Sequence, residues 1–171
     1  MSKFLRRVSI SALVAADLLL PATAREAGPD QTKATSGQKT AEYQAVERVI
    51  NNVFGWAVAK DFDLFFESIA DDSNFVAVTP FQMVKFGIDA VKRDTAFWAS
   101  PDFKAISHEI RDLRITFSQS GDVAWFYCVL DDFNEWKGQP ANWENVRWTG
   151  VLEKRSGKWR LAQHHLSFPQ K

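Results

Sequence analysis

His165 is the strongest single candidate for chemistry in the chain and stands in the segment His164-His165-Leu166-Ser167. A neutral imidazole hydrogen-bonds a ligand or transfers a proton near neutral pH. The alternative is a structural histidine satisfied by a neighbouring side chain or by backbone. His164 must point to the opposite face, because side chains alternate along a strand, so the two rings cannot chelate one metal ion together. We predict no metal site and no cofactor.

A set of polar residues is predicted to share a sheet face with His165. A three-residue loop, 155–157, pairs Thr149 with Gln163 and Arg147 with His165. A two-residue Ser-Gly turn would instead pair Trp148 with His165. We favour the first register. It gathers a ligand-binding patch, deepening toward Val151 and Leu161, of Arg147, Thr149, Gln163, His165 and Ser167.

Other residues of the pocket are predicted less directly. His108 alternates with Ile106 and Ile110, so it either faces a pocket or lies at the edge of the core. Arg147 either holds a ligand carboxylate or forms a structural ion pair. Five aromatic side chains are predicted to divide between cavity lining and subunit contact: Trp56, Phe66, Trp98, Trp125 and Trp148.

Composition limits the classes of protein to consider. The 171 residues favour one domain, and 21 Lys+Arg against 21 Asp+Glu argue against nucleic acid as the main partner. Seven Trp and 14 Phe are a large aromatic content that needs a core, a lined pocket or an interface. A single Cys excludes an internal disulfide.

The N-terminal segment has the layout of a targeting signal. Residues 1–24 begin with Lys3, Arg6 and Arg7, continue with a short apolar run, and end at the small-residue site Ala22-Thr23-Ala24. This order predicts a secretory signal peptide and a periplasmic or secreted protein without a stable membrane anchor. The alternative is an amphipathic extension of a cytosolic protein. Residues 25–40 are predicted to be a flexible leader, and residues 41–171 the folded domain.

The elements that must position these residues follow from periodicity. Apolar spacing predicts helices over residues 41–59, 62–70 and 88–99, with Asp61 capping the second. Short strands are expected at 75–78 and 83–86, and a long strand near 106–117 with a bulge at Arg111-Asp112. The strand 123–131 is apolar on both faces, which places it centrally or beneath a partner subunit. A loop over 132–142 precedes a last hairpin, 145–154 and 158–168.

This order gives an α+β fold in which three helices pack on one face of a strongly curved antiparallel sheet, leaving an internal cavity. The chain over residues 46–169 resembles the nuclear transport factor 2-like superfamily, in its SnoaL-like branch. The segments that carry the resemblance are Arg147-Trp148-Thr149, Gly157-Lys158-Trp159, His164-His165-Leu166-Ser167 and Gly121-Asp122-Val123-Ala124-Trp125.

The resemblance implies a cone-shaped, cystatin-like fold, an internal ligand cavity and frequent homodimers, but no single activity. In the ketosteroid isomerases of that superfamily a Tyr stabilises a developing oxyanion, a role that Tyr127 would take here. Those enzymes also need a carboxylate base in the pocket, and the sequence places none there clearly. The preferred hypothesis is therefore a homodimer that binds a small, largely apolar or aromatic molecule. The alternatives are an isomerase, dehydratase or hydrolase using His165 with Tyr127 or Arg147, and a structural dimerisation domain.

Overall fold

The structure, a computed structural model, describes residues 36–170; the predicted signal peptide and residues 25–35 of the predicted leader lie outside them. The helices are α1 (Ser36–Ala59), α2 (Phe62–Ser68), α3 (Ile88–Lys92) and α4 (Thr95–Ala99). The strands are β1 (Val76–Val78), β2 (Val84–Phe86), β3 (Phe103–Phe117), β4 (Val123–Trp136), β5 (Gln139–Pro140), β6 (Trp143–Arg155) and β7 (Lys158–Ser167). No helix within residues 36–170 is long and apolar enough to cross a membrane.

The first two helices follow the apolar spacing closely. Val46, Ile50, Val53 and Trp56 recur at intervals of three or four residues and are all buried. Helix α1 ends where predicted, at Ala59, but begins at Ser36, so the last five residues of the predicted leader are helical. Helix α2 begins after Asp61, whose Oδ1 accepts a hydrogen bond from the Leu64 backbone N–H at 3.0 Å. This confirms the predicted N-cap.

The predicted third helix, 88–99, is wrong in one respect, because it is two short helices. Backbone N–H groups of Arg93 and Asp94 donate to Asp89 O and Val91 O, which closes α3. Helix α4 then starts again at Thr95 and presents Trp98. The break turns the second half toward β3.

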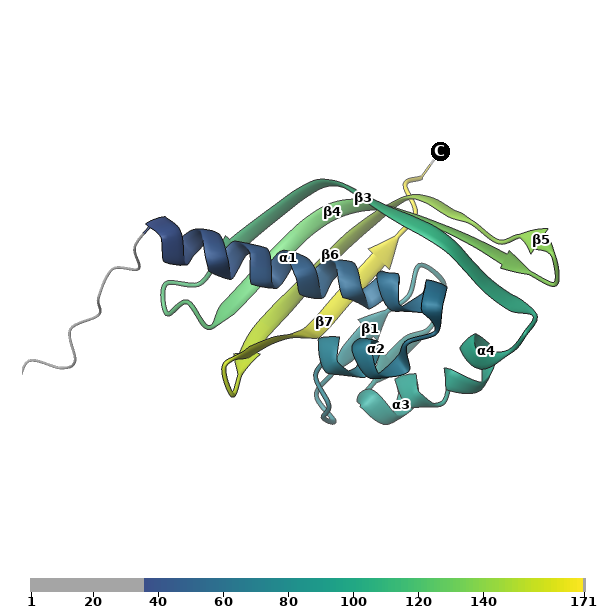
Figure 1. The fold of residues 1–171 in the computed structure, drawn as a ribbon, viewed down its shortest axis with the longest axis horizontal. Helices are drawn as coiled ribbons and strands as arrows, with labels where there is room; N and C mark the ends of the chain where they lie inside the picture. Colours follow the sequence, from purple (N-terminus) through teal and green to yellow (C-terminus); the bar gives the residue numbers. More distant parts are fainter. Residues whose placement is uncertain (1–35, 171) are drawn as a thin grey trace, which may run out of the picture. The chain divides into compact units, whose positions relative to one another are not determined.

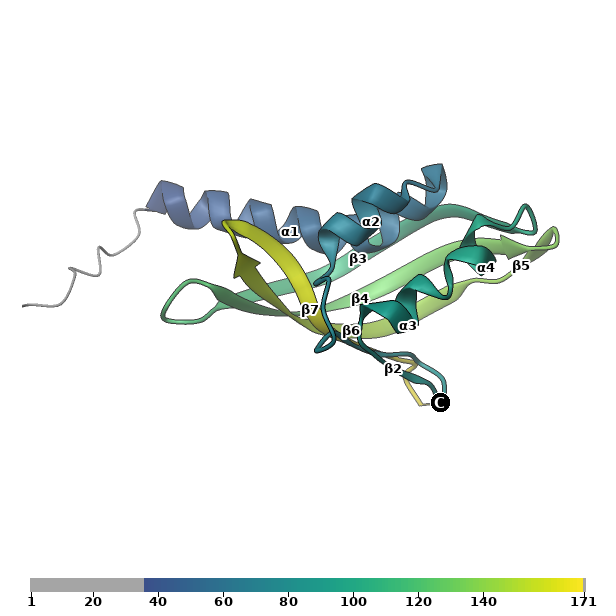
Figure 2. The ribbon, with the colours of Figure 1, turned by 90° about the horizontal axis from the view of Figure 1, so that it is seen from below.

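A single curved sheet carries the rest of the domain, in the order β2-β1-β7-β6-β4-β3, with β5 paired to β4. Figures 1 and 2 show the strands curling beneath α1 and α2, which lie along one face. The predicted α+β fold with helices on one face of a curved sheet is therefore confirmed. The sheet is mixed rather than antiparallel, because β1 runs parallel to β7.

Irregularities in β3 bend the sheet as the sequence predicts. The register of β3 against β4 shifts between Arg111 and Arg114, and Asp112 has a φ of 54°. A second shift lies between Ala105 and Ser107. Bulges of this kind increase local twist and bend the strand, which curls the sheet around the helices.

The predicted loop 132–142 is wrong. Strand β4 continues to Trp136 and turns through Lys137 and Gly138, both at positive φ, into the short strand β5. A two-residue turn with two positive φ values matches the twist of a hairpin. The extension adds two strand positions, Asp132 and Asn134, to the face that the helices cover.

The predicted register of the last hairpin is also wrong. Ser156 and Gly157, with φ values of 48° and 78°, form a two-residue turn. A bulge between Leu161 and Gln163 then shifts the pairing by one more residue. The two effects together pair Thr149 with His165, Arg147 with Ser167 and Val151 with Gln163.

Alternation along the strands divides the sheet into two faces. The inner face packs against the helices and carries the core, which includes Phe126, Cys128, Leu130, Trp148 and Leu152. The outer face carries the intervening residues, among them Trp125 and Tyr127, which are exposed. Within the described residues no helix covers this outer face, as Figure 2 shows.

Candidate functional site

A cavity of about 180 Å³ lies between the helices and the inner face of the sheet. Most of its wall is aromatic. The residues that line it are Val53, Phe54, Trp56, Ala57, Phe65, Trp98, Phe103, Asp132, Asn134, Trp143 and Leu166. Six of these are aromatic, and Asp132 and Asn134 are the polar members. The volume is close to that of an engineered cavity of about 150 Å³ that binds benzene.

Helices α1, α2 and α4 supply one wall of this cavity. The ring of Trp56 lies 4.8 Å from Phe65 and 5.4 Å from Trp98, measured between centroids. Phe65 and Trp98 meet edge to face, with 82° between their planes. The Trp56 Nε1–H donates to Val53 O at 3.1 Å, so the indole polar atom is satisfied within its own helix. The ring of Trp56 therefore offers the cavity only apolar surface.

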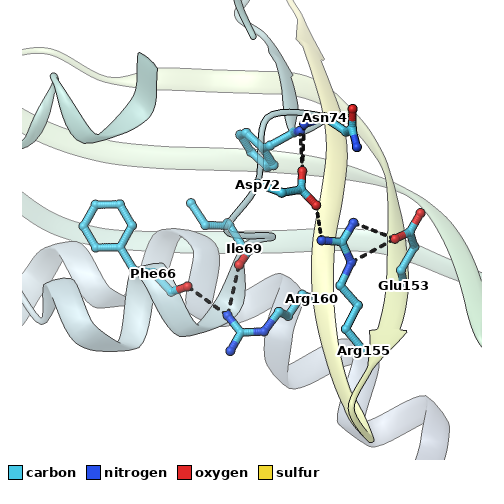
Figure 3. Close-up of polar contacts among 8 residues, drawn as sticks. Phe66, Ile69, Asp72, Asn74, Glu153, Arg155 and Arg160 are labelled. Carbon is cyan, nitrogen blue, oxygen red and sulfur yellow. Dashed lines mark hydrogen bonds and ion pairs between the residues drawn. The ribbon is translucent and has the colours of Figure 1, made fainter. Parts of the chain in front are cut away.

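Polar contacts from the last hairpin hold α2 in place (Figure 3). Arg160 Nη1 donates to the carbonyl oxygens of Phe66 and Ile69, at 3.1 and 3.2 Å. These are carbonyls that the end of a helix leaves without an intrahelical partner. Arg155 pairs with Asp72 in the turn that follows. The clamp fixes the helix that carries the cavity wall onto β7.

Asp132 brings a carboxylate to the apolar cavity. Its Oδ2 accepts a hydrogen bond from Asn134 Nδ2 at 2.8 Å, and Asn134 is itself held by a bond from its backbone N–H to Asn142 Oδ1 at 3.1 Å. Burial raises the pKa of Asp132 to about 6, and the hydrogen bond from Asn134 lowers it by less. The pKa of Asp132 therefore lies closer to neutral pH than that of an ordinary aspartate.

The neighbouring Asp131 has a different environment. It points to the outer face, where its Oδ2 accepts from Arg111 Nη2 at 2.6 Å and its Oδ1 accepts from the Asn145 backbone N–H at 2.6 Å. These hydrogen bonds, the backbone one foremost, hold the pKa of Asp131 below its ordinary value. Asn145, at a φ of 56°, lies in the β6 segment where the pairing with β4 shifts. The bulge leaves Trp143 directly opposite Asp132.

His108 lies across from Asp132 on the neighbouring strand. The two residues are paired in the β3–β4 register, so their side chains share the inner face. A Cβ added at Gly55 of α1 would lie 3.3 Å from His108 Cε1, which shows how closely the helix approaches the ring. Burial lowers the pKa of His108, so the imidazole is neutral at neutral pH. The inner face thus pairs a carboxylate with a neutral imidazole.

The structure separates the residues predicted from sequence into two groups. Trp56, Trp98 and His108 lie on the inner side, and Phe66 packs its ring 5.1 Å from that of Phe65. The others lie together on the outer face: Trp125, Tyr127, Arg147, Thr149, Gln163, His165 and Ser167. The predicted sharing of one face by the polar set is confirmed, but that face is the outer one and does not deepen toward Leu161, which is buried in the core. The bulge in β7 accounts for this, because it reverses the alternation after Leu161. The roles of these outer residues stay predictions.

His164 lies on the inner face, opposite to His165, as predicted. Its ring packs between Phe75 and Trp148, and its Nδ1 is buried without a hydrogen-bond partner. Burial, with the nearby charges of His165 and Lys85, lowers the pKa of His164 to about 4. His164 is therefore a neutral core residue.

Four of the outer residues, Trp125, Tyr127, Thr149 and Gln163, border an open hollow of about 400 Å³. Its side-chain lining comes from Arg114, Thr116, Trp125, Tyr127, Thr149, Val151 and Gln163. The exposed fractions of Trp125 and Tyr127 are 47% and 38%. The hollow has aromatic and basic side chains but, unlike the cavity, no carboxylate in its lining.

Asp132 and Asn134 are polar lining residues that were not among the predicted site residues. The signal is present in the alternation of the strand: Phe126, Cys128 and Leu130 face the core, and Asp132 and Asn134 continue the same phase. The continuation was not predicted, because the loop was expected to begin at Asp132.

Comparison with known proteins identifies the family. The SnoaL-like domain family matches residues 46–171. The chain belongs to the SnoaL-like domain family. No curated protein is significantly similar to the chain in sequence.

Solved structures that include several NTF2-like proteins share the fold at low sequence identity. An NTF2-like protein of unknown function from Prochlorococcus matches with a TM-score of 0.60 and 18% identity, covering 75% of this chain and 94% of that one. A protein from Novosphingobium aromaticivorans, provisionally named a scytalone dehydratase, has a TM-score of 0.68 and 14% identity, covering 80% and 89%. A provisionally named NTF2-like dehydratase from Streptomyces avermitilis has a TM-score of 0.64 and 19% identity, covering 78% and 99%. At these identities the likeness shows the fold alone.

Proposed function

We propose that the inner cavity binds a small, largely apolar or aromatic molecule of about one ring. The observation that carries this proposal is the cavity of about 180 Å³, walled by six aromatic side chains, with Asp132 and Asn134 as its polar members. Concave apolar sites with few, well-placed polar groups are the usual form of small-molecule sites. A core without function would gain stability by filling such a space.

A cavity-filling variant tests the binding proposal. Ala57 lines the cavity, so Ala57→Phe places a ring inside it, whereas Ala59→Phe adds the same ring at an exposed position of α1. Binding of toluene to both variants is measured directly by ligand-observed NMR. We expect Ala57→Phe to abolish toluene binding and Ala59→Phe to retain it. Equal toluene binding by both variants would contradict the proposal and favour a structural domain.

A second candidate function is cofactor-free proton transfer, as in an isomerase or a dehydratase. Support comes from Asp132, whose pKa of about 6 suits a general base, and from His108 paired across from it. In this proposal the Asp132 carboxylate removes a proton from a carbon next to a carbonyl group. Two structural neighbours carry provisional dehydratase names, which agrees with this class of reaction.

Hydrogen–deuterium exchange tests proton transfer without knowledge of the natural substrate. The protein is incubated with 2-cyclohexen-1-one in D₂O, and exchange at carbon is followed by NMR. We expect exchange above the buffer rate that falls about 100-fold in Asp132→Asn and persists in His165→Gln. Loss of exchange in His165→Gln alone would restore the hypothesis that His165, with Tyr127 or Arg147, performs the chemistry.

We further propose that the outer face pairs with a second copy of the chain. Trp125, Tyr127 and Val151 form a partly apolar surface on it, and exposed patches of this kind are typical of interfaces. Light scattering should give a dimer mass for the unmodified chain and a monomer mass for Trp125→Glu. Val58→Glu, at a 56% exposed position of α1, is the matched control and should remain dimeric.

Export is proposed from the N-terminal sequence alone. N-terminal sequencing of the protein recovered from its native host should give a mature chain that starts at Arg25. A chain that retains residues 1–24 would favour the cytosolic alternative.

A further inference from the structure

The carboxylate of Asp132 lacks an opposite charge. Its side-chain hydrogen-bond partner is the neutral amide of Asn134. The neighbouring Asp131 holds Arg111 on the other face of the sheet, and within residues 36–170 no Lys or Arg forms an ion pair with Asp132. Asp132 is only partly exposed, and charged groups that are largely removed from water are normally paired, because leaving them unpaired costs free energy. A bound ligand that carries positive charge would supply the missing partner.

The rest of the cavity wall also suits a cation, provided that the cation is weakly hydrated. Trp56, Trp98 and Phe65 pack against one another at interplanar angles between 32° and 82°, and all three line the cavity. The faces of aromatic rings carry negative quadrupole density and attract ammonium groups, most strongly for Trp. Aromatic walls with one carboxylate are the chemistry that recognises alkylated ammonium ions.

One ring of the wall already borders an ammonium group of the protein. Lys85 Nζ lies 5.9 Å from the centroid of Trp98 and is paired with Asp94. Its own charge is thus balanced outside the set of residues that line the cavity. A strongly hydrated cation, such as a metal ion, would find only the oxygen atoms of Asp132 and Asn134 in the cavity lining, too few for its coordination shell.

We infer that the cavity binds a small organic ammonium ion with alkyl substituents, whose charge lies among the aromatic rings beside Asp132. The inference rests on the proposed binding function of the cavity and names its ligand class. The cavity volume of about 180 Å³ suits a trimethylammonium group with a short side chain.

Binding of an ammonium ion beside Asp132 should depend on pH. The cross-strand partners of Asp132 are His108 on β3 and Trp143 on β6. The cavity lining adds Asn134 from the same strand, Phe54 and Trp56 from α1, and Trp98 from α4. Lys85 of β2 lies beside the ring of Trp98. A bound cation stabilises the ionised carboxylate, so binding should release a proton near pH 6 and tighten as the pH rises through that value. Protonation of His108 on the acid side would weaken binding further, and His108→Gln separates the two contributions.

Two probes of the same shape test the inference. Choline carries a trimethylammonium group, and 3,3-dimethylbutan-1-ol replaces its charged nitrogen by carbon. Calorimetric titrations of the full chain compare both probes with the unmodified protein, with Asp132→Asn, and with Glu135→Gln as a matched carboxylate on β4 that faces Lys104 instead. We expect choline to bind about tenfold more tightly than the alcohol, and this preference to vanish in Asp132→Asn and persist in Glu135→Gln.

The outcomes separate this inference from the binding proposal. Equal binding of both probes, blocked by Ala57→Phe, would overturn the ammonium inference and leave the cavity as a site for neutral molecules. Absence of binding by either probe, together with unchanged toluene binding in Ala57→Phe, would overturn both. If Asp132→Asn does not fold, the unmodified chain is titrated with choline in two buffers of different ionisation enthalpy at pH 6. Proton release then supports the inference, and no proton release contradicts it.

Discussion

The two faces of the sheet both carry aromatic side chains but surround them differently. The inner face encloses its rings beneath the helices and adds one carboxylate, Asp132, whereas the outer face leaves Trp125 and Tyr127 in solvent beside Arg114 and Arg147. Enclosure makes the inner carboxylate chemically unusual, since burial raises its pKa to about 6. Residue type alone therefore does not make a site: an aromatic ring lines a cavity on the inner face and lies in solvent on the outer face.

The largest contrast should be in stability. Trp148 is fully buried on the inner face and Trp125 is 47% exposed on the outer face. We expect Trp148→Ala to lower the free energy of unfolding by about 3–5 kcal/mol, because it leaves a cavity in the core. Trp125→Ala should change it by less than about 1 kcal/mol, measured in urea at a protein concentration where the chain is monomeric. Similar losses for both variants would remove the distinction between the faces.

Neutralising Asp131 and neutralising Asp132 should change the stability of the fold in opposite directions. Burial raises the pKa of Asp132 in the folded state to about 6. The free energy of unfolding therefore falls as the pH rises toward that value and the buried carboxyl group ionises. Asp132→Asn should therefore stabilise the fold at pH 7.5, by on the order of 2–3 kcal/mol, and leave it unchanged at pH 4. The folded pKa of Asp131 is lowered, so Asp131→Asn should destabilise the fold at pH 7.5 and much less at low pH. Thermal unfolding across pH 4–8 measures both, and a common sign at pH 7.5 would contradict the assigned environments.

His164 and His165 extend the comparison of the two faces to the stability of the fold at acid pH. Because the folded pKa of His164 is lowered to about 4, the stability it contributes is present above pH 6.5 and is lost as the pH falls toward 4. Replacing the ring by an apolar one, in His164→Phe, should flatten the decline in melting temperature between pH 6.5 and pH 4. His165→Gln, on the exposed outer face, serves as the control and should leave the decline in place. If His165→Gln rather than His164→Phe flattens the decline in melting temperature, the assignment of the two histidines to the two faces is contradicted.

The smallest of these effects concerns Gly150, where the inner face is tightly filled. A Cβ there would lie 2.6 Å from Phe126 Cε1 and 2.8 Å from Gln163 O. Gly150→Ala should cost about 1–3 kcal/mol through overpacking. Gly37→Ala, in α1 with no atom within 4 Å of the added Cβ, should stabilise the fold by up to about 1 kcal/mol. An unchanged unfolding free energy in Gly150→Ala would show that the inner face is looser than described.

Periodicity and capping were enough to predict most of the fold. The apolar spacing of α1, the Asp61 cap and the bulge at Arg111-Asp112 are local properties, and all three are confirmed. The register of the last hairpin could not be predicted in the same way. It depends on a two-residue turn and on a bulge after Leu161, where the Leu161 carbonyl accepts the Ala70 backbone N–H at 2.8 Å. That contact joins residues far apart in the chain.

The candidate site was predicted only in part for a related reason. Trp56 and Trp98 were named as cavity lining because aromatic residues on helix faces must pack somewhere, and the structure places both in the cavity wall. Asp132 was not, because a carboxyl group within a strand is unexpected on propensity alone. Its inward direction depends on strand β4 continuing past Asp131 and on its packing beneath α1, which are tertiary properties.

The most direct test of the central claim is to observe which indole groups respond to a ligand. Indole N–H resonances of the seven tryptophans are assigned by Trp→Phe variants and followed by NMR while choline is added to the full chain. We expect the shifts to concentrate on Trp56, Trp98 and Trp143, which line the cavity. Shifts confined to Trp125 would place the ligand on the outer face and contradict the account.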